Sequence, residues 1–140
     1  MKVRFQKLSE KAVTPSYAKA GDAGLDLVAI SKTDCNSYIE YGTGIAVELP
    51  EGHVGLVFPR SSVSGTIMVL SNCVGVVDSG YRGEIKFRFR TLDAFYQKHY
   101  EVGDKIGQLV IMPYPQIELE EVLVLAPSER GVGGFGSSGA

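Results

Sequence analysis

The run Ile85-Lys86-Phe87-Arg88-Phe89-Arg90 alternates apolar and basic side chains without a break. A period of two residues is typical of a β-strand with one face toward a core and the other toward water. No long stretch of the chain has the period of an amphipathic helix. The alternation therefore predicts a sheet protein. The basic face of this strand meets solvent or, as an alternative, another subunit or a ligand.

Other short apolar segments lie on both sides of this strand, between turns rich in Gly and Pro. The segments predicted to be strands are residues 3–8, 25–30, 38–41, 44–49, 53–58, 106–111 and 117–125. Pro113 and Pro115 end the segment at 106–111, because proline has no N–H to donate to a neighbouring strand. Many short strands with frequent turns predict an all-β barrel or sandwich.

The composition is typical of one soluble globular domain, with 140 residues, 44% of them hydrophobic and 21% charged. The net charge of −2 argues against nucleic-acid binding through a basic field. No apolar run has the length of a membrane span, and residues 1–6 lack the apolar core of a signal peptide. Cys35 and Cys73 have no metal-like spacing, so we expect free thiols and a cytoplasmic location.

The stretch before the alternating strand, residues 72–84, combines apolar and turn-forming residues. Val74, Val76 and Val77 are followed by Asp78-Ser79-Gly80, which predicts a β-hairpin. A carboxylate at such a turn is held on a rigid arm, which suits a general base. Tyr81 follows closely and could lie against a flat ligand. The plain alternative is a turn that happens to use Asp.

Gly75-Val76-Val77-Asp78 with Tyr81-Arg82-Gly83-Glu84 resembles the third motif of the trimeric dUTP diphosphatases (dUTPases). The resemblance implies that Asp78 activates the attacking water. It also implies that the main chain of residues 74–78 pairs with uracil, that Asn72 completes this edge, and that Tyr81 packs under the sugar. Lys86, just past the motif, is a further candidate for the same pocket. The substrate-binding residues expected here are Asn72, Gly75, Val76, Val77, Asp78, Tyr81 and Lys86.

Residues 20–27, Ala-Gly-Asp-Ala-Gly-Leu-Asp-Leu, resemble the first motif of the family. They place Asp26 in an apolar segment, where a lone buried carboxylate is costly. Asp26 therefore needs a partner, a metal or water, and a solvent-exposed strand end is an equal alternative. The resemblance implies that Asp26 helps to hold, through water, a Mg²⁺ ion that the triphosphate carries.

Pro59-Arg60-Ser61-Ser62 resembles the second motif. An Arg fork and two hydroxyls suit phosphate oxygens, although a polar turn or helix start is the plain alternative. By the resemblance, Arg60, Ser61 and Ser62 contact the phosphate chain. Residues 103–109 resemble the fourth motif, with Lys105 and Gly107 where Arg and Ala are usual. The resemblance implies that Gln108 contacts the α-phosphate region. The plain alternative is an outward-facing Gln at a strand edge.

The C-terminal segment, residues 130–140, is rich in glycine and unsuited to fold alone. It resembles the fifth motif, with Ser138 where Thr is commoner. A functionless terminus is the plain alternative. The resemblance implies an arm that orders over bound nucleotide, with Phe135 on uracil. The residues expected to close on the outer phosphates are Arg130, Gly136, Ser137 and Ser138.

Together the five motifs imply a Mg²⁺-dependent homotrimer that hydrolyses dUTP to dUMP and diphosphate. They imply a jelly-roll-like β domain over residues 1–129, a flexible arm over 130–140, and sites shared between subunits. We expect it to bind neither nucleic acid nor membrane and to work in the cytoplasm, or the host cytoplasm if the source is viral. A dCTP deaminase-like enzyme, a catalytically quiet nucleotide sensor and a plain structural β-domain are the alternatives.

Overall fold

The computed structural model describes residues 1–92 and 98–134. The strands are β1 (Arg4–Lys7), β2 (Leu25–Val28), β3 (Ser31–Asp34), β4 (Ile39–Gly42), β5 (Ile45–Glu48), β6 (His53–Pro59), β7 (Met68–Leu70), β8 (Gly75–Val77), β9 (Lys86–Thr91) and β10 (Lys105–Pro113). Within these residues the only helix is one 3₁₀ turn, η1 (Ser61–Gly65). The predicted all-β class is confirmed.

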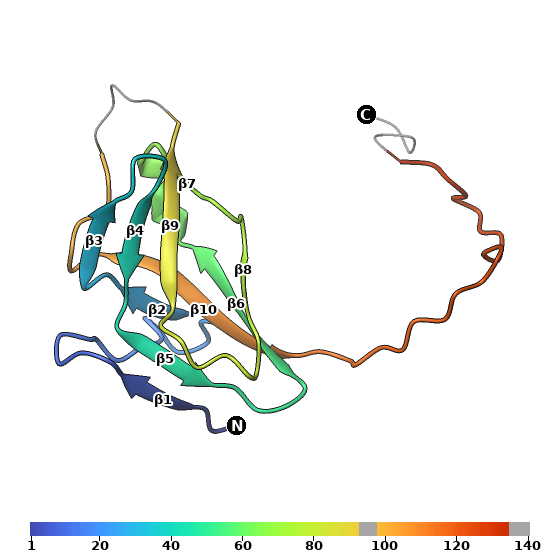
Figure 1. Cartoon of the computed structure of the whole chain (residues 1–140), viewed down its shortest axis with the longest axis horizontal. Helices are drawn as coiled ribbons and strands as arrows, with labels where there is room; N and C mark the ends of the chain where they lie inside the picture. Colours follow the sequence, from blue (N-terminus) through green and yellow to red (C-terminus); the bar gives the residue numbers. More distant parts are fainter. Residues whose placement is uncertain (93–97, 135–140) are drawn as a thin grey trace.

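The strands form two four-stranded sheets and a two-stranded sheet, all antiparallel (Figure 1). One sheet has the order β2-β10-β6-β8, the other has the order β3-β4-β9-β7, and β1 pairs with β5. Buried side chains from both large sheets belong to one hydrophobic cluster. The core therefore lies between the sheets, as in a sandwich, which is one of the two arrangements expected from the sequence.

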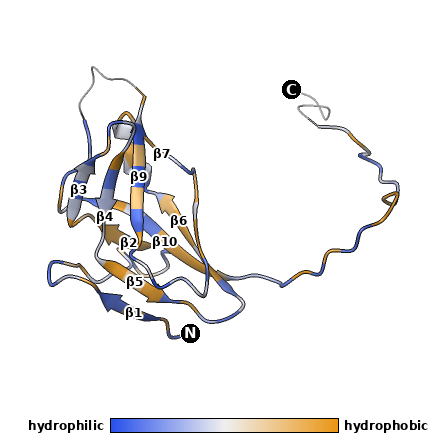
Figure 2. Cartoon of the chain, in the orientation of Figure 1, coloured by the Kyte–Doolittle hydropathy of each residue, from blue (hydrophilic) through white to orange (hydrophobic). Residues whose placement is uncertain are grey.

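Strand β9 follows the predicted alternation. Phe87 and Phe89 are fully buried, with their rings stacked at a centroid distance of 6.1 Å, whereas Lys86, Arg88 and Arg90 are exposed. Figure 2 shows the same contrast between elements, with β5 largely hydrophobic and β1 hydrophilic. Burial of two aromatic rings from one strand is a large apolar contribution to the core.

Strand β10 is the central strand of its sheet and pairs with both β2 and β6. Its register with β2 shifts between Lys105 and Gly107. A side chain at Gly107 would place its Cβ 2.0 Å from the Phe87 ring and 2.9 Å from the Phe58 carbonyl oxygen. Gly107 is therefore required by packing, since the Phe87 ring fills the space that a methyl group would take.

The hairpin predicted over residues 72–84 is wrong. Strand β8 pairs with β6, and the chain after Asp78 enters β9 in the other sheet. The stretch is therefore a crossing between sheets. Local turn chemistry predicts that the chain reverses direction, but it does not say which strand lies beside the next one.

The C-terminal segment leaves the sheets after Pro113 and runs away from them through the described residues to Gly134 (Figure 1). The strand predicted over 117–125 does not form in this single chain. Ile117, Leu119 and Leu125 are exposed there. A strand needs a hydrogen-bonded neighbour, and the described part of the chain offers this segment none. Strand β3 was not predicted from the sequence, because its residues Ser31–Asp34 are polar.

Candidate functional site

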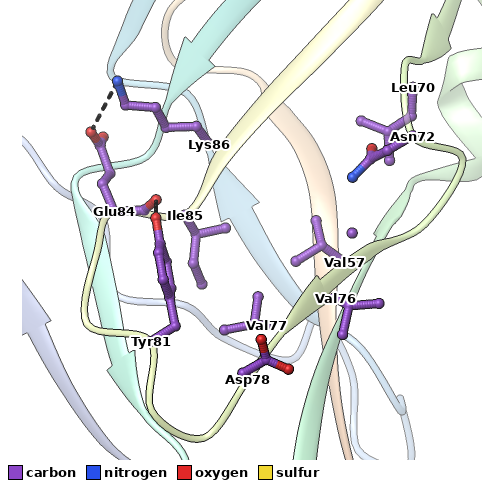
Figure 3. A pocket seen from close by; sticks show the side chains of 11 residues that line it. Val57, Leu70, Asn72, Val76, Val77, Asp78, Tyr81, Glu84, Ile85 and Lys86 are labelled. Carbon is purple, nitrogen blue, oxygen red and sulfur yellow. Dashed lines mark hydrogen bonds and ion pairs between the residues drawn. The ribbon is translucent and has the colours of Figure 1, made fainter.

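The first hollow lies along β8, which is an edge strand in the order β2-β10-β6-β8. Within the described residues, β8 pairs only with β6, so its other edge keeps backbone donors and acceptors available. That edge borders a hollow of about 190 Å³. The residues that line the hollow are Val57, Leu70, Asn72, Gly75, Val76, Val77, Asp78, Tyr81, Glu84, Ile85 and Lys86 (Figure 3).

All seven substrate-binding residues expected near the third motif line this hollow. Asp78 follows directly on β8 and is exposed at one end of it. Asn72 belongs to the turn that brings the chain into β8, where Cys73 has a positive φ of 59° and donates its N–H to the Leu70 oxygen at 3.0 Å. The turn and the strand thus place an amide and a carboxylate at opposite ends of the same edge.

Tyr81 is held across the hollow from β8 by its own hydroxyl, which donates to the Glu84 backbone oxygen at 3.0 Å (Figure 3). A Cβ at Gly83 would clash with that hydroxyl and with the ring, so a side chain there would displace Tyr81 from this position. Glu84 in turn accepts the Gly44 N–H at 2.7 Å. These contacts fasten the loop after Asp78 to the junction between β4 and β5.

Lys86 lines the hollow, but its ammonium group has partners within the protein. It lies 2.8 Å from the Glu40 carboxylate and 3.9 Å from that of Glu84. The hydrogen bond with Glu40 raises the pKa of Lys86 above its ordinary value. Glu40 also accepts from Arg88 at 2.8 Å. A role of Lys86 toward a ligand would therefore compete with an existing ion pair.

The second hollow, of about 420 Å³, lies where the first, second and fourth motifs meet. It is lined by Ala18, Asp22, Ala23, Gly24, Asp26, Arg60, Ser61, Gln108 and Val110. Gln108 is half-buried on β10 and donates its amide to the Pro59 oxygen at 3.3 Å. Residues far apart in sequence meet here because β10 lies between β2 and β6.

Asp26 is the buried charge of this second hollow, with 8% of its surface exposed. One carboxylate oxygen lies 2.9 Å from Arg60 Nε, and the other accepts from Lys105 Nζ at 2.8 Å. Of the two alternatives for Asp26, the structure therefore has the buried, partnered one. The pair of cations offsets the cost of burying the carboxylate, and the carboxylate orients the Arg60 guanidinium at the hollow.

Asp78 and Arg60 lie toward opposite ends of β6. Val77 is in register with Gly55, so Asp78 follows near the start of β6, whereas Arg60 follows its end. About six residues of extended strand, or roughly 20 Å, separate the two positions. One chain thus does not bring Asp78 and Arg60 to the same phosphorus atom.

A sequence profile described as dUTPase matches residues 10–139 of the chain. The chain belongs to the dUTPase family. A deoxyuridine 5'-triphosphate nucleotidohydrolase of Tropheryma whipplei (strain Twist) is 43% identical over 131 residues, covering 90% of this chain and 88% of that protein. The corresponding protein of Gloeobacter violaceus is 40% identical and covers 99% and 97%.

A solved structure of the family has the same fold. The dUTPase of Staphylococcus bacteriophage 80alpha, solved with dUPNHPP, superposes with a TM-score of 0.85 at 30% identity over 99% of each chain. Family membership, expected from the five motifs, is confirmed. The individual residue roles stay predictions. Phe135, Gly136, Ser137 and Ser138 lie outside the described residues, and Arg130 is exposed, with its Nε donating to the Gly133 oxygen at 2.9 Å.

Some residues of the two hollows were not expected from the sequence. Leu70 and Ile85 line the first, and Gly24 lines the second. Lys105 was expected only as a variant of the fourth motif, and its ion pair with Asp26 was not predicted. In residues 1–92 and 98–134, no helix is long and apolar enough to cross a membrane.

Proposed function

We propose that the protein hydrolyses dUTP to dUMP and diphosphate. The observation that carries this proposal is the edge of β8 that has no partner strand in residues 1–92 and 98–134, with Asp78 at its end and Tyr81 across a hollow of about 190 Å³. Such an edge offers main-chain donors and acceptors to a flat ring. Uracil, with an N–H between two carbonyls, has the matching pattern on its own edge.

Main-chain pairing explains the choice of base. Cytosine presents a different order of donors and acceptors, and buried groups would be left unpaired. The thymine methyl would meet the close-fitting strand. Tyr81, fixed by its bond to the Glu84 oxygen and by Gly83, supports the side of the sugar that would carry a 2′-hydroxyl. Asn72 at the far end of β8 completes the edge.

The residues of the second hollow hold the phosphate chain. Arg60 offers a fork of donors already oriented by Asp26, and Ser61 and Gln108 add neutral donors. Ser62 does not line this hollow, but it is exposed on η1 next to Ser61 and adds a further hydroxyl. Asp78 takes a proton from water as it attacks the α-phosphorus in line with the leaving diphosphate. Residues 130–140 form an arm distinct from the β domain of residues 1–129. This arm closes over the nucleotide and excludes bulk water.

The chain fits a Mg²⁺ ion that the triphosphate brings with it. Among the described residues, no group of three or more His, Cys, Asp or Glu is placed to hold a metal. Asp26 has both oxygens within 3 Å of cationic groups, so it fits contact through water better than direct ligation. Mg²⁺ commonly keeps several waters and binds through one carboxylate and substrate phosphates. Bound there, it would neutralise phosphate charge.

We propose that the protein works as a homotrimer with shared sites. The roughly 20 Å between Asp78 and Arg60 exceeds what one α-phosphate can bridge, and it supports a site in which these residues come from different subunits. Residues 117–125, which have exposed apolar side chains and pair with no strand among the described residues, support an arm that reaches another subunit. Free thiols at Cys35 and Cys73 suit the cytoplasm, where we place the enzyme.

A substrate panel tests the activity. With Mg²⁺ present, we expect diphosphate release from dUTP, with kcat/KM values for dTTP, dCTP and UTP at least about 100-fold lower. The main-chain pattern and the Tyr81 wall are the reasons for this selectivity. Release of ammonia from dCTP would favour the deaminase. Tight dUTP binding without any turnover would favour a sensor protein.

Mixing two inactive variants tests the shared site. Asp78→Asn and Arg60→Ala chains are each expected to be inactive as homotrimers. After the two are unfolded together in equal amounts and refolded, random assortment should restore about one quarter of wild-type activity, because some sites combine two intact residues. If both residues act within one chain, no intact site forms and the mixture stays inactive. Refolded wild type is the control for recovery.

A further inference from the structure

Tyr100 lies five residues before the start of β10, and none of the five sequence motifs includes it. It is 6% exposed, and its hydroxyl oxygen lies 3.2 Å from the hydroxyl oxygen of Ser62. Ser62 is exposed on η1, next to Ser61, which lines the second hollow. Lys98, just before Tyr100, also lies near η1, with its Nζ 4.0 Å from where a Cβ of Gly65 would stand. Residues 98–100 therefore lie against η1, which carries Ser61 and Ser62.

The ring of Tyr100 is fixed by the core. It meets Phe89 at a centroid distance of 5.6 Å and Tyr41 at 6.4 Å, both edge-on. The Tyr41 hydroxyl donates to the Tyr100 backbone oxygen at 2.9 Å. Backbone and side chain are thus both held, so the Tyr100 hydroxyl is a fixed point against which Ser62 can be oriented.

The direction of the Ser62–Tyr100 hydrogen bond follows from the ligand. Phosphate oxygens only accept, so Ser62 must use its single proton toward a phosphate. Its oxygen then accepts the proton of Tyr100. A phenol is a stronger acid than an aliphatic alcohol and is the better donor in this pair. The resulting chain, Tyr100 to Ser62 to phosphate, strengthens each bond by polarisation.

We infer that Tyr100 is a positioning residue of the phosphate site, which fixes the Ser62 hydroxyl so that its proton points at the triphosphate. The inference rests on the proposed function, because it takes the phosphate chain as the ligand of Ser62. The structural fact beneath it is the hydrogen bond between a buried, packed tyrosine and an exposed serine of η1.

The test uses Tyr100→Phe, Ser62→Ala and the double variant in the full-length protein. Phenylalanine keeps the ring among Tyr41 and Phe89 and removes only the hydroxyl. Loss of one neutral hydrogen bond should weaken binding of a non-hydrolysable dUTP analogue, measured by calorimetry, about fivefold in Tyr100→Phe. In the Ser62→Ala background the same change should have no further effect. Binding of deoxyuridine, which has no phosphate, should be unchanged in the same calorimetric measurement.

Tyr38→Phe is the matched control, since it removes the hydroxyl of a surface tyrosine whose ring lies 4.9 Å under the Arg88 guanidinium. It should bind and turn over as wild type. Equal analogue affinity of Tyr100→Phe and wild type overturns the inference, as does an equal loss with and without Ser62. Analogue binding is read separately from turnover, so a wild type without dUTPase activity refutes the proposed function and still leaves the test of Tyr100 decisive.

Discussion

Asp78→Asn is expected to lower kcat for dUTP by about a thousandfold while KM stays within a few-fold of wild type. Asparagine keeps the size and the hydrogen-bonding reach of the side chain but cannot take a proton from water. Asp78 is exposed at the end of β8, with its carboxylate at the hollow in Figure 3. Because the side chain is exposed at the end of the strand, the fold should be unaffected.

Steady-state release of diphosphate measures this effect, and calorimetry with dUTP checks that the variant still binds. Asp34→Asn is a suitable control, because Asp34 is an exposed carboxylate outside both hollows that accepts the Asn36 N–H at 2.9 Å. It should retain wild-type turnover. A kcat for Asp78→Asn within tenfold of wild type would mean that another group activates the water.

Gly107→Ala is expected to lower the free energy of unfolding by about 3 kcal/mol. The added methyl carbon would lie 2.0 Å from a ring atom of Phe87, which is fully buried and stacked on Phe89. The Phe58 carbonyl oxygen, at 2.9 Å, prevents escape toward β6. For a chain of this size the melting temperature should fall by roughly 10 °C.

A compensating change makes this prediction specific to one contact. Phe87→Leu alone should destabilise the protein through lost packing, but together with Gly107→Ala it should recover much of the loss, since leucine leaves room for the methyl. Gly80→Ala is the control, because its Cβ would meet no atom within 4 Å. Additive losses in the double variant would show that the Phe87 ring is not the obstacle.

The sequence predicted the fold class well because the signal was local. Strict alternation in residues 85–90 could only be satisfied by a strand with two phenylalanines inside, and β9 has that form. The hairpin at 72–84 was wrong for the opposite reason. Strand β8 belongs to its sheet because it pairs with β6, whose residues are more than fifteen positions away in the chain. A turn motif carries no information about that partner.

The same limit applies to the candidate site. Motifs placed Asp26, Arg60 and Gln108 at the phosphates, and the structure brings them to one hollow. They did not predict that Asp26 is neutralised by Arg60 and Lys105 together. Tyr100 carried no signal, because its link to Ser62 joins residues 38 positions apart through a side-chain contact. Such contacts follow from packing and not from spacing.

The length of β8 has its own consequence. An open strand border usually invites another polypeptide to add to it, which is a route to aggregation. This border is three residues long, Gly75 to Val77. It extends for only about 10 Å, which is enough for a single pyrimidine. Another polypeptide could form too few inter-strand hydrogen bonds there to pair stably. Because β8 is short, its open edge can keep main-chain groups available for a small ligand without promoting aggregation by strand addition.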